Sequence, residues 1–167
     1  MLCYHGSPVA GINTLTPPPG GPLYLTNNRA YAMFYIRDME INWVTCGVRD
    51  GVVVYDELFP DQLRTLYAGR GGWLYASEND GFAPGNSPWI VLADKAVPVV
   101  VVEYISDAYE AILREIDAGT VRVDSYDPPP ACVLAEDGNG INLYAMSSVC
   151  WRGLQEILAR VSALERR

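Results

Sequence analysis

The chain has 167 residues, of which half are hydrophobic and 19% are charged, so it can bury the core of one ordinary domain. Twelve basic residues against twenty acidic ones leave a net charge of −8, which argues against a surface built to neutralise nucleic-acid phosphates. The longest apolar run, Ala96–Val102, is too short to span a bilayer, and no basic-then-apolar signal segment opens the chain. We therefore expect a soluble, cytoplasmic protein without a membrane partner.

Short strands and one helix are expected in the first third of the chain. Met1–His5 is apolar and aromatic and breaks at Gly6-Ser7-Pro8, which predicts a strand with alternating faces. A proline-rich loop over 17–22 leads to a second strand, Leu23–Leu25. A helix follows from about Asn28 to Ile36, and Thr26, Asn27 or Asn28 can provide its N-cap.

The middle of the chain adds further strands and a short helix. Gly51–Tyr55 has β-branched residues on both faces, which predicts a well-buried strand. Pro60–Ala68 has helical spacing of its apolar residues, and Trp73–Ala76 and Pro88–Leu92 are strand candidates. Val97–Ile105 is the strongest strand candidate in the sequence.

Two helices are expected after that strand. Tyr109–Asp117 carries an apolar stripe, Ser106 or Asp107 can cap it, and a glycine at position 119 suits its C-terminal end. Ser147–Leu164 predicts an amphipathic helix at the end of the chain. Strands outnumber helices and no linker divides the chain, so we expect a single α+β domain over 1–167, with its core over about 1–125 and a C-terminal extension over about 126–167.

Cysteine, histidine and glycine usage exclude several common sites. The four cysteines form no CxxC pair and the chain has one histidine, so we expect reduced thiols and no zinc site of the usual cysteine and histidine type. No GxxxxGK[ST] loop and no GxGxxG turn is present, so the common phosphate cradles are missing.

Three separated segments carry the candidate chemistry: Tyr4-His5-Gly6-Ser7, the segment 23–35 with its three tyrosines, and Val102-Glu103-Tyr104-Ile105. Taken singly, a histidine before a glycine is more often structural, and tyrosines at a strand–helix corner are more often core residues. Glu103 is harder to explain structurally. The valines before it predict a buried strand, and a carboxylate there must face water, a partner or a ligand.

Taken together, the three segments resemble the signatures of the His–Tyr–Glu ADP-ribosyltransferases, the branch of diphtheria toxin and poly(ADP-ribose) polymerase. His5 comes first, Tyr24 and Tyr35 follow eleven residues apart, and Glu103 comes last. The segments are also similar to small uncharacterised bacterial proteins that keep the HGS and tyrosine motifs. The resemblance implies a split β-sheet core with short flanking helices, and it implies NAD as a substrate, with no metal.

The resemblance also implies roles for individual residues. Glu103 would be the catalytic residue, because cleavage of the nicotinamide–ribose bond passes through an oxocarbenium-like cation that a carboxylate stabilises. Tyr24 and Tyr35 would sandwich the nicotinamide ring. Gly6 would let the backbone approach the carboxamide, and His5 would bind the adenosine-side ribose. Hydroxyl contacts would come from Ser7 or Thr26.

The positive charge that a dinucleotide needs is scarce in this acidic chain. Arg29 and Arg37 are the nearest candidates to contact the phosphates, and a positive patch is expected near His5. The resulting expectation is a mono-ADP-ribosyltransferase that acts on an unknown macromolecule, more readily a protein than a nucleic acid. Three alternatives stay open: an NAD- or ADP-ribose-binding module of the same fold without turnover, an interaction protein that docks its C-terminal helix on a partner, and a thiol–imidazole pair made by Cys3 and His5.

Overall fold

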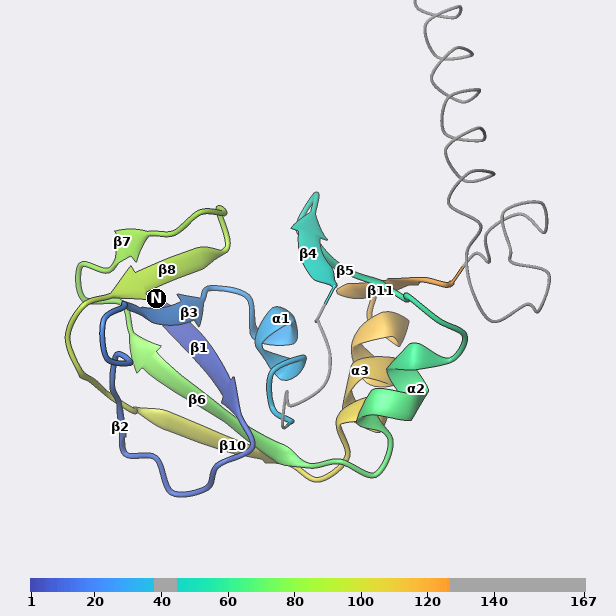
Figure 1. Ribbon diagram of the computed structural model, residues 1–167, viewed down its shortest axis with the longest axis horizontal. Helices are drawn as coiled ribbons and strands as arrows, with labels where there is room; N and C mark the ends of the chain where they lie inside the picture. Colours follow the sequence, from blue (N-terminus) through green and yellow to red (C-terminus); the bar gives the residue numbers. More distant parts are fainter. Residues whose placement is uncertain (38–44, 127–167) are drawn as a thin grey trace, which may run out of the picture. The chain divides into compact units, whose positions relative to one another are not determined.

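The computed structural model describes residues 1–37 and 45–126, and these belong to one compact unit, Met1–Tyr126. Over the described residues the chain is a mixed α and β structure, mostly strands with a few short helices, in agreement with the expected class (Figure 1). The strands are β1 (Leu2–Ser7), β2 (Thr14–Leu15), β3 (Leu23–Thr26), β4 (Cys46–Arg49), β5 (Val52–Asp56), β6 (Gly72–Glu78), β7 (Ala83–Pro84), β8 (Ile90–Ala93), β9 (Val97–Pro98), β10 (Val101–Ile105) and β11 (Val121–Asp124). The helices are α1 (Arg29–Met33), α2 (Gln62–Tyr67) and α3 (Ala108–Asp117). None of them is long and apolar enough to cross a bilayer.

The main sheet is antiparallel and has β1 near its centre. Its strand order is β10-β6-β1-β3-β8-β7, and every neighbouring pair runs antiparallel. A separate three-stranded sheet, β11-β5-β4, pairs β5 with β11 in parallel and with β4 antiparallel. Strand β1 therefore contributes residues to both faces of the main sheet at its middle.

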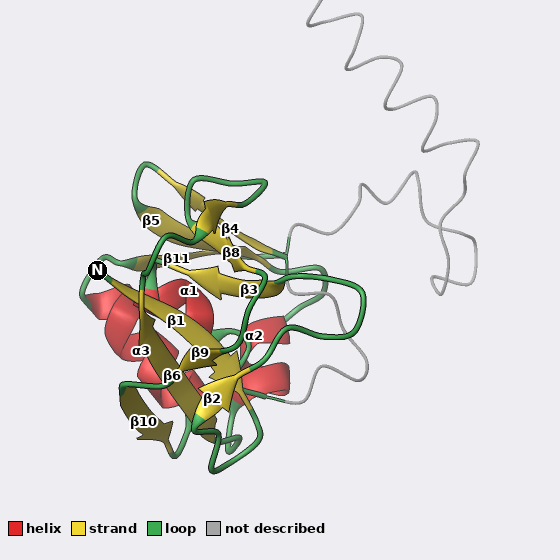
Figure 2. Ribbon diagram, turned by 90° about the vertical axis from the view of Figure 1, so that its left-hand side faces the viewer, coloured by secondary structure: helices red, strands yellow, loops and turns green. Residues whose placement is uncertain are grey.

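Each face of the main sheet carries its own hydrophobic cluster. Helix α1 lies between the main sheet and the part of the unit formed by the small sheet, α2 and α3 (Figure 1), and the larger cluster joins residues of all these elements. Cys3 and Tyr75 belong to the second cluster, on the opposite face, together with residues of β2 and β9 (Figure 2). Tyr4 packs against the first cluster and Cys3 against the second, so the predicted alternation of β1 is confirmed.

Helix α1 is fixed at its start by two polar side chains. Asn28 is the N-cap, and its side-chain oxygen accepts a hydrogen bond from the Tyr31 N–H at 3.0 Å. Thr26 Oγ1 accepts the N–H of Asn28 at 3.1 Å, which aligns the turn between β3 and the helix. The helix ends at Met33, earlier than predicted, because the chain tightens over 34–36 into turns in which each N–H bonds the carbonyl three residues back.

Two glycines let this tightened end of α1 approach the sheet. A Cβ at Gly6 would lie 2.2 Å from the Ala32 carbonyl oxygen, and one at Gly72 would clash with the carbonyl oxygen of Ile36. No side chain fits at either position without moving backbone. The glycines on β1 and β6 therefore set how closely α1 lies over the sheet.

The single strand predicted over 97–105 is wrong. Val97–Pro98 forms β9, which pairs with β2, whereas Val101–Ile105 forms β10, which pairs with β6 in the main sheet. The expected burial is wrong as well, because Val100, Val101 and Val102 are each about half exposed. Among the described residues β10 is an edge strand, so only one of its sides is covered.

Most other elements lie where the sequence predicts them. The expected strand over 51–55 is β5, with Val53, Val54 and Tyr55 buried, and the expected helix over 60–68 is α2. Asp107 caps α3 through a hydrogen bond from the Glu110 N–H, and a glycine with positive φ follows its end. The first strand extends through Ser7, past its predicted end. The C-terminal helix predicted over 147–164 lies outside the described residues.

Candidate functional site

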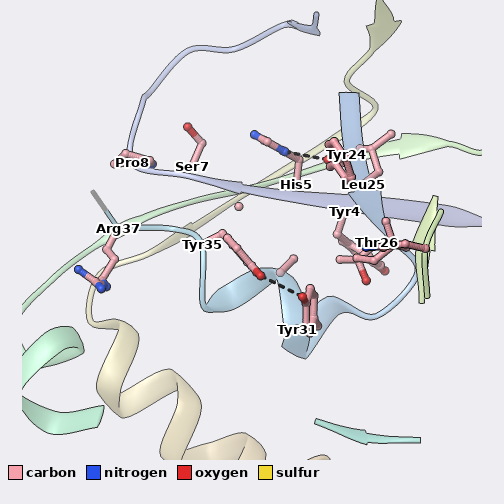
Figure 3. Close-up of a pocket in the computed structure, with 14 residues that line it drawn as sticks. Tyr4, His5, Ser7, Pro8, Tyr24, Leu25, Thr26, Tyr31, Tyr35 and Arg37 are labelled. Carbon is pink, nitrogen blue, oxygen red and sulfur yellow. Dashed lines mark hydrogen bonds between the residues drawn. The ribbon is translucent and has the colours of Figure 1, made fainter. Parts of the chain in front are cut away.

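A cavity of about 590 Å³ opens between the middle of the main sheet and α1 (Figure 3). Its walls come from β1, from β3, from the segment 31–37 and from the loop before β8. All six residues expected to contact NAD line it. The lining residues are Tyr4, His5, Gly6, Ser7, Pro8, Tyr24, Leu25, Thr26, Tyr31, Ala32, Tyr35, Arg37, Asn86 and Ile90.

The main sheet and the short β3–α1 turn bring these segments together. Strands β1 and β3 are hydrogen-bonded neighbours, with Tyr4 opposite Thr26, so the two predicted motifs lie side by side. Because α1 starts only three residues after β3 ends, it folds back over β1 at Gly6. Tyr31 and Tyr35 therefore point into the space that β1 and β3 border (Figure 3).

Four tyrosines give the cavity its aromatic character. Tyr31 and Tyr35 are joined through their hydroxyls at 2.9 Å, with ring centroids 5.4 Å apart. Burial raises the pKa of Tyr35 far above its usual value, so its hydroxyl stays neutral. Tyr24 is 57% exposed and lies at the rim, and Tyr4 borders the floor from β1. Neutral ring faces of this kind suit a flat aromatic ligand.

His5 is held in one tautomer by the neighbouring strand. Its Nδ1 lies 3.3 Å from the carbonyl oxygen of Tyr24, and since a carbonyl only accepts, Nδ1 must carry the proton (Figure 3). Burial lowers the pKa of the imidazole, and the bond to Tyr24 opposes this in part. In the neutral ring, Nε2 is then an acceptor, and it has no hydrogen-bond partner among the described residues. It can accept a hydroxyl of a ligand.

The charge of the cavity differs from that of the whole chain. Arg37 lines it, whereas no aspartate or glutamate does among the residues described. The guanidinium carbon of Arg37 lies 5.1 Å from the centre of the Tyr67 ring, a cation–π distance that fixes its position. Of the two arginines expected to contact the phosphates, Arg37 lines the cavity and is 5% exposed, whereas Arg29 is outside the lining and pairs with Glu103 and Glu115.

Three of the residues expected to contact NAD also take part in hydrogen bonds or packing within the fold. Thr26 Oγ1 donates to the Trp89 carbonyl at 2.7 Å and accepts from Asn28, so its proton is already used. Ser7 Oγ accepts the Val9 N–H at 3.1 Å. At Gly6 the space that a side chain would fill is occupied by the backbone of α1, so the glycine is required for packing whether or not a ligand binds.

Glu103 does not line the cavity. Its carboxylate is held by Arg29 at 2.5 Å and 3.1 Å, and the third nitrogen of Arg29 bonds Glu115 at 2.7 Å. Glu103 nevertheless faces the same side of the sheet as Gly6, because both lie opposite Leu74, one from each neighbouring strand. Two strand spacings separate them, which is about 10 Å.

Several lining residues were not expected from the sequence. Tyr4 could have been found, because it shares a strand face with Gly6 two residues away. Asn86 lies in the loop before β8 and Ile90 is the first residue of β8, and the position of both depends on the pairing of β8 with β3, which no local pattern gives. Cys46 lies behind the cavity beside the Tyr35 hydroxyl, and burial raises its pKa to about 12, so it is a poor nucleophile.

The thiol–imidazole alternative is not supported by the geometry. Cys3 is fully buried in the second cluster, and burial raises the pKa of its thiol. His5 is tied to the carbonyl of Tyr24 instead. Within the described ranges, no group of three or more histidine, cysteine or acidic residues is placed to hold a metal ion.

No protein-family model, curated protein or solved structure matches this chain. The chemistry of the site therefore has to be argued from its own residues.

Proposed function

We propose that the chain is an NAD-dependent mono-ADP-ribosyltransferase and that the cavity binds the nicotinamide end of NAD. The observation that carries the proposal is the meeting of the histidine–glycine–serine motif with both tyrosines of the second motif in one cavity. These residues are distant in sequence, and the pairing of β1 with β3 and the short turn into α1 bring them together. The volume, about 590 Å³, is within the range of small-molecule sites.

The lining suits the parts of this ligand. Nicotinamide is a flat ring that can stack on the exposed face of Tyr24 or on Tyr35, which is a gain of about 0.5–1.5 kcal/mol per aromatic pair. Nε2 of His5 can accept a ribose hydroxyl. An acidic side chain in the lining would repel the phosphates, and none is present among the described residues.

In the proposed reaction the bond between C1′ of the nicotinamide-side ribose and the nicotinamide ring nitrogen breaks, and the nitrogen keeps the bonding pair. A nucleophile of the acceptor then bonds C1′ and loses its proton, so the products are ADP-ribosylated acceptor, nicotinamide and one proton. Glu103 would stabilise the positive charge that develops on the ribose. The net charge of −8 favours a basic protein over a nucleic acid as the acceptor.

A second candidate function is an NAD- or ADP-ribose-binding module without turnover. The observation that favours it is the position of Glu103 outside the lining and in an ion pair with Arg29. In that case the cavity binds the ligand and the carboxylate never reaches the ribose. The two candidates share the binding site and differ only in cleavage.

Binding is tested by calorimetric titration of NAD into the wild type and into two tyrosine variants. Tyr24 and Tyr104 are almost equally exposed, at 57% and 59%, but only Tyr24 lines the cavity. We expect Tyr24→Ala to weaken NAD binding about tenfold through loss of a stacking face, and Tyr104→Ala to leave it unchanged. Equal effects of the two variants, or no binding to the wild type, would refute the site.

Turnover is tested separately by measuring nicotinamide release from NAD by the wild type and by Glu103→Gln. The variant keeps the shape of the side chain and removes its charge. Release by the wild type with a loss of about a hundredfold or more in the variant supports the transferase. Equal NAD binding by both proteins with no release from either supports the binding module.

A further inference from the structure

Each of the three guanidinium nitrogens of Arg29 contacts a carboxylate, and the two carboxylates come from different elements. Its Nε and Nη2 contact the two carboxylate oxygens of Glu103 on β10, at 3.1 Å and 2.5 Å, and its Nη1 contacts Glu115 on α3 at 2.7 Å. Arg29 and Glu103 are 37% and 44% exposed at their side chains, so water and a ligand can reach the pair. Such a two-bond contact fixes the orientation of the carboxylate as well as its charge.

This contact opposes what the proposed reaction requires of Glu103. A carboxylate stabilises a nearby cation through its uncompensated negative charge, and a guanidinium at 2.5 Å compensates that charge. Both oxygens of Glu103 already accept a hydrogen bond from Arg29, so a ribose hydroxyl has only the remaining lone pairs to bond. In the arrangement observed, the negative charge of Glu103 is therefore compensated by Arg29.

The element that holds Glu103 also forms the wall of the cavity. Arg29 is the first residue of α1, and Tyr31 and Tyr35, on and just after the same helix, line the cavity. Glu103 lies on the face of the sheet that α1 covers, in line with Gly6 and about 10 Å from it. Arg29 therefore joins the carboxylate of Glu103 to the helix that forms one wall of the cavity.

We propose that Arg29 is a positioning residue that keeps Glu103 paired and outside the NAD cavity, and that the rate of nicotinamide release is limited by separation of this pair. The proposal rests on the proposed transferase function. With water as the acceptor, the reaction that reports it converts NAD and water to ADP-ribose, nicotinamide and one proton. No oxidant or reductant takes part.

The test measures steady-state nicotinamide release by the full chain, and NAD binding by calorimetry, for the wild type and three variants. Arg29→Gln removes the charge that holds Glu103, and Arg29→Lys keeps the charge but loses the two-bond geometry. Arg122→Gln is the matched control, because Arg122 makes a similar two-bond contact with Asp124, which is on β11 and outside the cavity lining. Thermal unfolding of each variant checks that it is folded.

We expect kcat for nicotinamide release to rise about tenfold in Arg29→Gln, which corresponds to about 1.4 kcal/mol of barrier, and to rise less in Arg29→Lys. The KM and the dissociation constant for NAD stay unchanged, and so does every value in Arg122→Gln. The rise must disappear in the double variant Arg29→Gln/Glu103→Gln, since the effect acts through Glu103.

Two results would overturn the inference while NAD binding stands. One is a kcat in Arg29→Gln that equals the wild-type value, because the pair would then not limit the rate. The same holds for a kcat that falls toward that of Glu103→Gln and is restored in Arg29→Lys, because Arg29 would then align Glu103 for reaction. The other is NAD binding without release from either the wild type or Arg29→Gln. If the wild type does not bind NAD at all, the proposed function itself fails, and this inference fails with it.

Discussion

Substitution of Gly6 by alanine tests how α1 is seated on the sheet. The added Cβ would lie 2.2 Å from the carbonyl oxygen of Ala32 and 3.0 Å from the carbonyl carbon of Tyr35, and both neighbours are backbone. The first separation must widen to at least 3.0 Å, which a rotamer change cannot do. Overpacking of this kind costs about 1–3 kcal/mol, and the lower entropy of the unfolded alanine chain returns less than about 1 kcal/mol. We expect a net loss of about 1–2 kcal/mol.

Urea unfolding followed by circular dichroism measures this loss. At a typical m of about 2 kcal/mol per molar urea, the midpoint should fall by about 0.5–1 M with no change in slope. Gly21→Ala is the matched control, because its Cβ would meet no atom within 4 Å, and it should leave the midpoint unchanged. Because the forced movement also displaces Tyr35, NAD affinity should fall in Gly6→Ala. A Gly6→Ala midpoint equal to that of Gly21→Ala would refute the reasoning.

Two further predictions concern the polar groups of the cavity. Thr26→Val removes the hydrogen bond to the Trp89 carbonyl and the acceptor for the Asn28 N–H. We expect the free energy of unfolding in urea to fall by about 1–2 kcal/mol, with NAD affinity unchanged. A fall in affinity without a loss of stability would show that the hydroxyl binds the ligand. Burial lowers the pKa of His5 in the folded state. Below a pH of about 6.5 the unfolded chain therefore binds a proton at this residue more readily than the folded chain does. The free energy of unfolding then falls as the pH decreases from about 6.5 toward the lowered pKa. Unfolding at pH 7.5, 6.5 and 5.5 should show a smaller fall in His5→Gln, which keeps a donor for the Tyr24 carbonyl, and parallel curves for the two proteins would contradict the assignment.

Local sequence patterns predicted the elements that depend on local interactions. The N-caps Asn28 and Asp107 and the helical spacing in 60–68 were confirmed, because a cap and an apolar stripe act within one or two turns of the chain. The division of 97–105 into β9 and β10 was missed, because the run of valines is equally compatible with one strand or two. The choice between them depends on partners, β2 and β6, that are distant in sequence.

The sequence predicts several of the residues that line the candidate site, but it does not predict the contacts that these residues make. The spacing of Tyr24 and Tyr35 and the position of His5 led to residues that do share a cavity. Their other contacts could not be inferred from sequence: the hydroxyl of Thr26 is used by the loop before β8, and Glu103 is bound by Arg29 from a segment 74 residues away. Pairing between side chains depends on the tertiary fold, which a motif does not contain.

The open side of β10 has a consequence for how the protein behaves at high concentration. Over residues 1–37 and 45–126, one edge of β10 has no strand partner, and Val101 and Val102 on it and Val100 just before it are each about half exposed. Such an edge is a template for association with a second extended chain. Glu103 lies in the middle of this strand, and the charged pair that it forms with Arg29 opposes aggregation at this edge. Glu103→Gln should therefore lower solubility as well as turnover, and a sedimentation profile belongs beside each rate measured with it. One carboxylate then serves both the proposed chemistry and the resistance of this edge to association.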